Sequence, residues 1–287
     1  MKSEKGRVSI LQVIRSRSSM RTFSTESVPQ ETLEELRRVL VCEDQGPFGN
    51  RCRFGLIDSS LHPQLDLGSL SSYGVIKNPY GYLVGAVQKG DRSLVDYGYL
   101  FQRILLEATR LGLGTCWLGG TFRPEKVASL FPLESGEIIP AVSPFGIPAE
   151  KRSIVDGFLR WGASSKLRKP WGQLFYDASG HSLKEGDIPL VQDGLEAVRL
   201  APSAMNRQPW RVVIEGQKAH FFLDTKEDRK SPVRFTELDL GIAMYHFEAV
   251  LREEGTKGKW EFDPPRTSYG HPEWEYIASW LLRGEGE

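Results

Sequence analysis

Residues 201–210 read Ala-Pro-Ser-Ala-Met-Asn-Arg-Gln-Pro-Trp, and this stretch decides the interpretation of the whole chain. A helical run over 193–200 ends before Pro202, because proline cannot continue a helix. The β-branched run at 211–214 predicts a buried strand directly after the stretch. A polar turn therefore joins a helix to a strand, and it carries three hydrogen-bonding side chains, Ser203, Asn206 and Gln208.

The side chains of this turn allow two interpretations. Serine and asparagine are common turn residues that brace the backbone, and Trp210 would then be an ordinary core residue. Alternatively, the amides of Asn206 and Gln208 bind the edge of a heteroaromatic ring, since each amide both donates and accepts hydrogen bonds. The residues of the turn alone leave both open.

Composition excludes several classes of protein. The chain has 287 residues with 37 basic and 37 acidic side chains, which argues against a surface that binds polyanions throughout. No apolar run is long enough to cross a bilayer, and the charged N-terminus lacks the apolar core of a secretory signal. The three cysteines form no metal or disulfide pattern: Cys42, Cys52 and Cys116. We expect a globular, cytoplasmic protein without a bound metal or nucleic-acid partner.

Ordinary patterns predict the scaffold of the first half. Residues 27–30 (Ser-Val-Pro-Gln) predict a capping box that opens a helix reaching about Val41. Strands are expected at 53–57 and 80–87, and a strand followed by a turn at 138–146.

Two further segments contain residues suited to binding. Arg17 and Arg21 stand among serines at the end of a short helix, where guanidinium and hydroxyl groups could hold a phosphate; a solvated basic arm is the alternative. An amphipathic helix over 95–111 precedes residues 112–120, Gly-Leu-Gly-Thr-Cys-Trp-Leu-Gly-Gly. Four glycines there let the backbone approach a flat ligand, although a glycine helix end beside a buried Trp117 would look the same.

These segments together resemble the FMN-dependent nitroreductase family. Residues 202–210 match its Pro-Ser-x-x-Asn-x-Gln-Pro-Trp signature. Residues 17–23 are similar to its Arg-Arg-Ser-x-Arg-x-Phe motif, with Ser18 in place of the second arginine. Residues 112–120 are similar to its Gly-Leu-Gly-Thr-x-Trp-x-Gly-Gly segment, and 168–170 resemble an Arg-Lys-Pro segment of the family.

The resemblance implies an α+β, nitroreductase-like fold and a site for FMN. We call residues 17–23 the arginine arm and residues 112–120 the glycine segment. In the family the arginine arm contacts the phosphate and ribityl chain, the paired glycines of the glycine segment face the ring edge, and the polar turn contacts the ring. The residues that this carries over are Arg17, Ser18, Ser19, Arg21, Gly119, Gly120, Arg168, Lys169, Pro202, Ser203, Ala204, Asn206 and Gln208. The implied activity passes electrons from NAD(P)H through the flavin to a nitro or quinone acceptor.

The second half of the chain repeats the first. Four residues of the first half recur in the second at a constant spacing of 143 residues: Asp96, Gly98, Gly112 and Trp117 as Asp239, Gly241, Gly255 and Trp260. Asn50-Arg51 likewise recurs as Asn206-Arg207 at a different spacing. We infer two tandem half-units that form a pseudo-twofold dimer within one chain, with predicted domains 1–176 and 177–287.

The two halves lack complementary parts of the family pattern. The first keeps the arginine arm and the glycine segment, and the second keeps the polar turn. Since nitroreductases are usually dimers that grip FMN between subunits, this predicts one FMN per chain and a monomer that mimics a dimer, with a homodimer as the alternative. Degenerate repeats also fit a second hypothesis, a non-catalytic flavin-binding or sensor protein.

Overall fold

The computed structural model describes residues 8–41, 45–62, 64–72, 74–149, 167–227 and 233–282. Its internal contacts divide the chain into two compact units. We call Ser16–Ser165 the N-terminal unit, and Met1–Arg15 together with Lys166–Glu287 the C-terminal unit. The domain boundary predicted after residue 176 depends on sequence motifs alone, and it stays a prediction.

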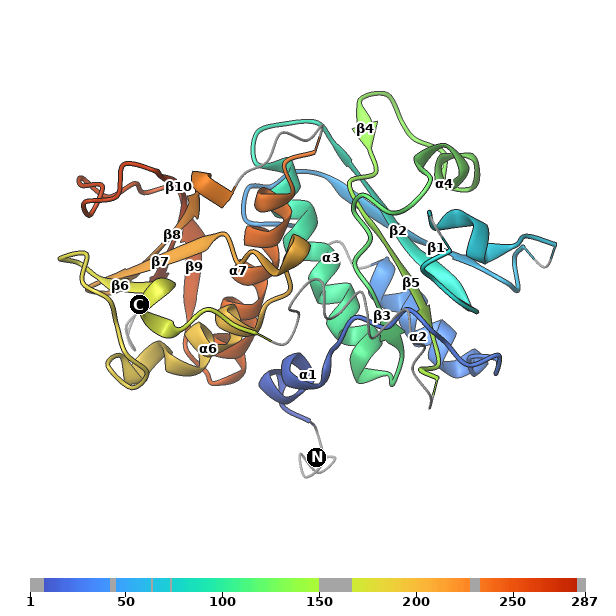
Figure 1. Ribbon diagram of the computed structural model, residues 1–287, viewed down its shortest axis with the longest axis horizontal. Helices are drawn as coiled ribbons and strands as arrows, with labels where there is room; N and C mark the ends of the chain where they lie inside the picture. Colours follow the sequence, from blue (N-terminus) through green and yellow to red (C-terminus); the bar gives the residue numbers. More distant parts are fainter. Residues whose placement is uncertain are drawn as a thin grey trace. The chain divides into compact units, whose positions relative to one another are not determined.

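The N-terminal unit is built on an antiparallel sheet (Figure 1). In the described residues the strand order is β1-β2-β5-β3, and β4 pairs with the end of β2. The strands are β1 (Cys52–Asp58), β2 (Gly81–Gln88), β3 (Gly114–Thr115), β4 (Glu137–Ile138) and β5 (Val142–Gly146). The helices are α2 (Gln30–Leu40), the 3₁₀ turn η1 (Leu67–Leu70), α3 (Ser93–Arg110) and α4 (Pro124–Leu130).

Helix α3 packs onto this sheet through aromatic side chains. Phe54 of β1 contacts Tyr97 and Phe101 of α3, with ring centroids 5.6 and 5.7 Å apart. The contact depends on Gly85 of β2, where a Cβ would lie 2.4 Å from the Phe54 ring and 3.0 Å from the Tyr97 ring. The helix predicted at 95–111 and the strands predicted at 53–57 and 80–87 are confirmed.

Two local predictions were wrong. Helix α2 begins at Gln30 with Pro29 as its N-cap and without a side-chain capping bond, so residues 27–30 form no capping box. Ser27 precedes the actual N-cap by two residues, and proline has no hydroxyl to replace it. Residues 138–146, predicted as a strand followed by a turn, instead contribute to two strands, β4 and β5, which are separated at Pro140, a residue without an N–H to donate to a ladder.

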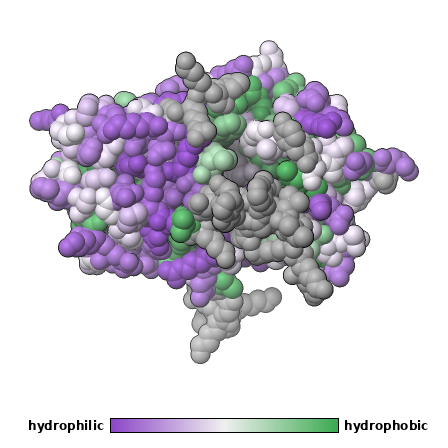
Figure 2. Space-filling model, viewed as in Figure 1, coloured by the Kyte–Doolittle hydropathy of each residue, from purple (hydrophilic) through white to green (hydrophobic). Residues whose placement is uncertain are grey.

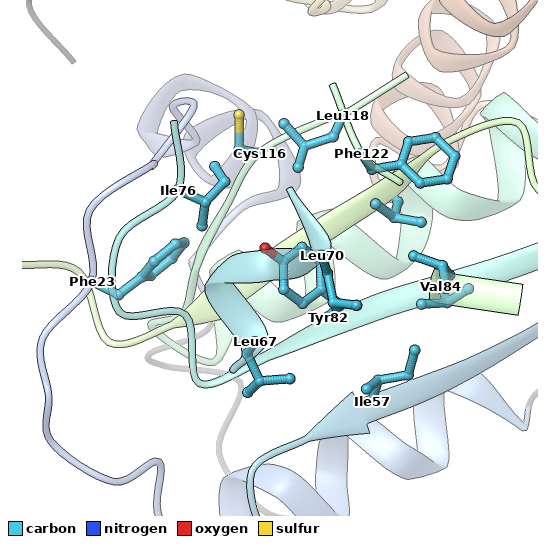
Figure 3. Close-up of a cluster of buried hydrophobic side chains, with 12 residues drawn as sticks. Phe23, Ile57, Leu67, Leu70, Ile76, Tyr82, Val84, Cys116, Leu118 and Phe122 are labelled. Carbon is cyan, nitrogen blue, oxygen red and sulfur yellow. The ribbon is translucent and has the colours of Figure 1, made fainter. Parts of the chain in front are cut away.

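A buried cluster joins three parts of the N-terminal unit. Figure 3 shows Phe23 from the arginine arm, Tyr82 from β2 and Leu118 from the glycine segment converging in one core. Cys116 belongs to this core and is 1% exposed. The core therefore fixes the end of the arginine arm and the glycine segment in one unit.

The C-terminal unit contains a mixed sheet. In the described residues its order is β6-β7-β8-β10-β9, with β6 parallel to β7 and the other pairs antiparallel. The strands are β6 (Phe175–Asp177), β7 (Trp210–Glu215), β8 (Lys218–Asp224), β9 (Gly258–Glu261) and β10 (Trp274–Leu282). The α-helices are α1 (Ile10–Ser16), α6 (Gln192–Leu200) and α7 (Phe235–Glu253). The 3₁₀ turns are η2 (Trp171–Gln173), η3 (Pro189–Val191), η4 (Ala204–Asn206) and η5 (Thr225–Glu227).

The two faces of this sheet carry different side chains. Phe221 of β8 points to the helical face, where its ring packs edge-on against Phe247 of α7 and Trp260 of β9. Phe222, the next residue, points to the opposite face and packs with Tyr269 and Trp274. The alternation of a strand thus gives the sheet an aromatic layer on each side.

The start of the chain packs onto the C-terminal unit. The backbone N–H of Ile10, at the first turn of α1, donates to Glu253 Oε2 at 2.7 Å, and Ile10, Val13 and Ile14 are buried. A carboxylate at a helix N-terminus is favourable because the first N–H groups of a helix have no partner within it. The chain passes into the N-terminal unit between Arg15 and Ser16.

The two units share an internal plan. The path β1-β2-β5-β3 of one corresponds to β7-β8-β10-β9 of the other, and a long helix follows the second strand in both. Both long helices end at a left-handed glycine, Gly112 with φ 81° and Gly255 with φ 83°. Leu113 N bonds to Ala108 O and Thr256 N to Leu251 O, a Schellman end repeated at the spacing of 143 residues.

The surface drawn in Figure 2 is mainly hydrophilic over the C-terminal unit, with hydrophobic residues scattered between. Among the described residues, no helix combines the length and the apolar composition that a membrane span requires.

Candidate functional site

The polar turn between α6 and β7 is strained. Helix α6 ends at Leu200, before Pro202, and the chain then forms the 3₁₀ turn η4. Three residues without the freedom of glycine adopt left-handed φ angles: Met205 at 53°, Asn206 at 55° and Gln208 at 52°. Such conformations cost about 1–3 kcal/mol each and persist where surrounding groups hold them. Met205 is 66% exposed, so packing does not hold it.

Hydrogen bonds from the segment at 167–169 hold the turn. Asn206 Oδ1 accepts from Arg168 Nη1 at 3.0 Å, and Asn206 Nδ2 donates to Leu167 O at 2.8 Å. Gln208, only 3% exposed, accepts at Oε1 from the backbone N–H of Lys169 at 2.8 Å. Ser203 Oγ accepts from Gln208 N at 2.9 Å. The structure thus brings the predicted Arg168 and Lys169 against the predicted turn.

The charges of this segment are partly compensated. Lys169 Nζ pairs with Glu227 Oε1 at 2.8 Å. Burial lowers the pKa of Arg168, and the nearby Arg199 lowers it further. Arg168 is thus a half-buried guanidinium that is held by the acceptors of the turn.

A buried carboxyl group lies under the turn. Both oxygens of Asp239, in the first turns of α7, are 3.0 Å from the backbone N–H of Ala204. Asp239 is 5% exposed, and burial raises its pKa to about 8, although the charge of Arg207 opposes the shift. The turn is therefore fixed to the helix beneath it by one backbone hydrogen bond.

A second buried charge holds the exit of the turn. Arg211 Nη2 pairs with Asp224 Oδ2 at 2.8 Å, and the two side chains are only 8% and 12% exposed. Arg211 Nη1 donates to the carbonyls of Gln208 at 3.1 Å and Trp210 at 2.6 Å. This ion pair connects the end of the turn to strand β8.

In the N-terminal unit, the arginine arm runs beside the glycine segment. Ser19 forms a parallel bridge with Thr115, and Met20 N donates to Thr115 O at 2.8 Å. On the other side, Lys77 N donates to Arg21 O at 2.8 Å. The buried Phe23 then anchors the arm in the core of Figure 3. Two segments that the sequence separates by about ninety residues therefore lie side by side.

This arrangement leaves polar groups that suit a ligand. Arg21 Nη1 and Thr115 Oγ1 are buried, and neither has a hydrogen-bond partner within the described part of the chain. The backbone N–H groups of Gly119 and Gly120 also donate to no described residue. A Cβ at Gly120 would have nothing within 4 Å. A buried guanidinium nitrogen without an acceptor favours an anion, and open glycine amides can receive a flat polar edge.

The candidate residues therefore form two groups, one in each unit. The N-terminal unit holds Arg17, Ser18, Ser19, Arg21, Gly119 and Gly120. The C-terminal unit holds Arg168, Lys169, Pro202, Ser203, Ala204, Asn206 and Gln208. In the described ranges no three His, Cys, Asp or Glu side chains gather as a metal site requires.

Comparison with known proteins identifies the family. A family model described as "Putative TM nitroreductase" matches residues 9–250. The chain belongs to this nitroreductase family. A search among curated proteins gave no match.

Solved structures agree with the nitroreductase fold. A putative nitroreductase from Thermotoga maritima MSB8 is similar over 98% of this chain and 97% of its own, with a TM-score of 0.64 and 20% identity. At this identity the likeness shows the fold, which is the predicted α+β nitroreductase-like fold.

Two other solved structures align with half of this nitroreductase-family chain. A putative nitroreductase from Desulfovibrio desulfuricans, solved in complex with FMN, is similar over 51% of this chain and 93% of its own, at 22% identity and a TM-score of 0.39. An FMN-dependent nitroreductase from Clostridium difficile R20291 covers 49% and 88%, at 18% identity and a TM-score of 0.41.

Sequence reasoning missed the groups that support the nitroreductase turn. In the sequence, Asp239 stands out only as one of the residues that recur in both halves, and Arg211 only as the first residue of a predicted strand. The sequence does contain a signal for Asp239, because each half has both an aspartate of the repeat and an Asn-Arg pair. Nothing in the sequence pointed to the pairing of Arg211 with Asp224.

Proposed function

We propose that the protein is an FMN-dependent oxidoreductase that passes electrons from NAD(P)H to a nitro or quinone-type acceptor. The observation that carries this proposal is the buried Arg21 Nη1 without a partner in the described residues, beside a glycine segment with open N–H groups. Membership of the nitroreductase family supports it independently. When bound, FMN supplies a centre that accepts and donates hydride.

The residues divide the task of holding the mononucleotide. The arginine arm binds the phosphate by charge-assisted bonds from Arg17 and Arg21, with hydroxyls from Ser18 and Ser19. The N–H groups of Gly119 and Gly120 orient the polar edge of the ring. A cofactor bound by backbone amides keeps its position because those groups do not reorganise.

The remaining residues of the proposal belong to the polar turn and to the segment at 167–169. Pro202, Ser203, Ala204, Asn206 and Gln208 are assigned to the ring, and Arg168 and Lys169 are assigned to the phosphate. The proposal gives one FMN per chain and a monomer as the working assembly.

Reconstitution with FMN tests the proposal directly. The purified chain should bind one FMN, lose its yellow colour when NADH or NADPH is added without oxygen, and recover the colour with a nitroarene. Arg21→Ala should weaken FMN binding, and Arg15→Ala is the matched control because Arg15 is exposed at the end of α1. A chain that neither binds FMN nor gains thermal stability from it would refute the proposal.

A non-catalytic flavin-binding protein is the second candidate. The amides of Asn206 and Gln208 already bond to Arg168, Leu167 and Lys169, so the chain braces its own turn. A yellow protein that bleaches with dithionite but not with NADH or NADPH would favour this candidate.

A further inference from the structure

In each unit a buried aspartate of the long helix accepts hydrogen bonds from a turn, but the number of bonds differs. In the N-terminal unit the buried Asp96 accepts from Phe48 N at 2.9 Å, Asn50 N at 2.8 Å and Asn50 Nδ2 at 2.9 Å. In the C-terminal unit Asp239 accepts from Ala204 N, and this is its one hydrogen-bond donor among the described residues. The correspondence is residue by residue, since Phe48 and Ala204 are related by the same spacing as Asn50 and Asn206.

The two turns differ in backbone strain. The turn above Asp96 has its left-handed residue at Gly49, with φ 74°, which costs glycine little. The turn above Asp239 has left-handed Met205, Asn206 and Gln208. The strained turn is thus the one with fewer bonds to its aspartate, and the Ala204 N–H stands at its start.

We propose that Asp239 is the positioning residue of the Pro202–Gln208 turn, which it holds in the conformation that binds the flavin through the Ala204 N–H. The binding part of this inference rests on the proposed function. Asp239 acts through the backbone of the turn and does not itself touch the cofactor. Asp96 performs the same bracing for a turn that has lost the binding residues, so it serves as a built-in control.

Four variants of the full chain test the role. Asp239→Ala removes the acceptor, whereas Asp239→Asn keeps an oxygen for the Ala204 N–H. Ala204→Pro removes the donor instead, and Ser203, with ψ 158°, already has the extended backbone that a following proline requires. Asp96→Ala is the matched control in the other unit.

Two measurements separate the positioning role from the flavin proposal. The first is hydrogen exchange of the turn amides by NMR in the flavin-free protein. We expect Asp239→Ala to raise exchange of the Gln208 amide, and of the Ala204 amide itself, at least tenfold, while Asp239→Asn stays within threefold of wild type. Ala204→Pro should raise exchange at Gln208 by a similar factor, and Asp96→Ala should change neither amide.

The second measurement is FMN affinity by fluorescence titration. Asp239→Ala and Ala204→Pro should weaken binding at least tenfold, with Asp239→Asn and Asp96→Ala within threefold. Unchanged exchange in Asp239→Ala, or an equal loss of affinity in Asp96→Ala, would overturn the inference. If wild type binds no FMN while the exchange pattern holds, the proposed function is wrong and the positioning role stands. If Asp239→Ala does not fold, Ala204→Pro and Asp239→Asn carry both measurements.

Discussion

Replacing Arg211 with methionine should destabilise the C-terminal unit strongly. Arg211 and Asp224 form an ion pair whose side chains are 8% and 12% exposed, so water cannot compensate for a lost partner. Methionine fills most of the volume of the arginine stem and offers no donor. The carboxylate of Asp224 would stay buried, and the carbonyls of Gln208 and Trp210 would each lose a donor.

The expected loss is about 3–5 kcal/mol in the free energy of unfolding, which is typical when one partner of a buried pair is removed. Total stabilities are about 5–15 kcal/mol, so the loss is a large part of what a domain has. Lys226→Met gives the exposed comparison. Lys226 pairs with Glu273 at 2.8 Å while its side chain is 71% exposed, and breaking such an exposed pair should change the stability little.

Urea denaturation followed by circular dichroism measures both variants against wild type. The double variant Arg211→Met/Asp224→Leu removes both charges, and it should recover at least half of the loss, because apolar replacements of a buried pair are often neutral. A loss of less than about 1 kcal/mol in Arg211→Met, or a double variant no more stable than the single one, would show that the pair is not buried as the geometry indicates.

Three further predictions concern the cofactor, the packing and the pH dependence. Arg21→Ala should weaken FMN binding about 10–100-fold, the size of a charge-assisted bond, whereas Arg15→Ala should change it less than threefold; equal effects in a titration would contradict a specific phosphate contact. Gly85→Ala should lower the unfolding free energy by about 1–3 kcal/mol because the added Cβ meets the Phe54 ring. The added Cβ of Gly120→Ala meets nothing within 4 Å, so the unfolding free energy of this variant should stay within about 0.5 kcal/mol of wild type in the same urea assay. The folded-state pKa of Asp239 is about 8, which is above its unfolded value, so the native state binds more protons than the unfolded state. The stability of the wild type should therefore fall relative to that of Asp239→Asn as the pH rises from about 5 to about 8. Parallel melting-temperature profiles of the two proteins over that range would contradict an elevated pKa.

Periodicity predicted the elements that carry long, regular patterns. The helices α3 and α6 and the strands β1, β2 and β7 follow from runs that the sequence shows directly. The division of β4 from β5 falls at Pro140, whereas Pro144 lies within β5, and the start of α2 depends on which residue becomes the N-cap. Such details depend on pairing partners and backbone angles that a residue pattern does not contain.

The candidate site was predictable as segments but not as contacts. The polar turn, the arginine arm and the glycine segment each carry a recognisable pattern. The bond from Arg168 to Asn206 joins residues 38 apart, and no local rule connects them. The left-handed angles of Met205 and Gln208 were equally hidden, because residue preference favours other conformations there. Long-range support is what the sequence could not show.

The docking of α1 also has a consequence for synthesis of the protein. Ile10 leaves the ribosome early, but Glu253, which accepts its N–H, follows 243 residues later. At about 5–20 residues per second, the first helix waits on the order of 12–50 s for its binding surface. During translation the N–H of Ile10 therefore lacks this acceptor until the chain has passed Glu253, so the contact between the first helix and the end of α7 forms late.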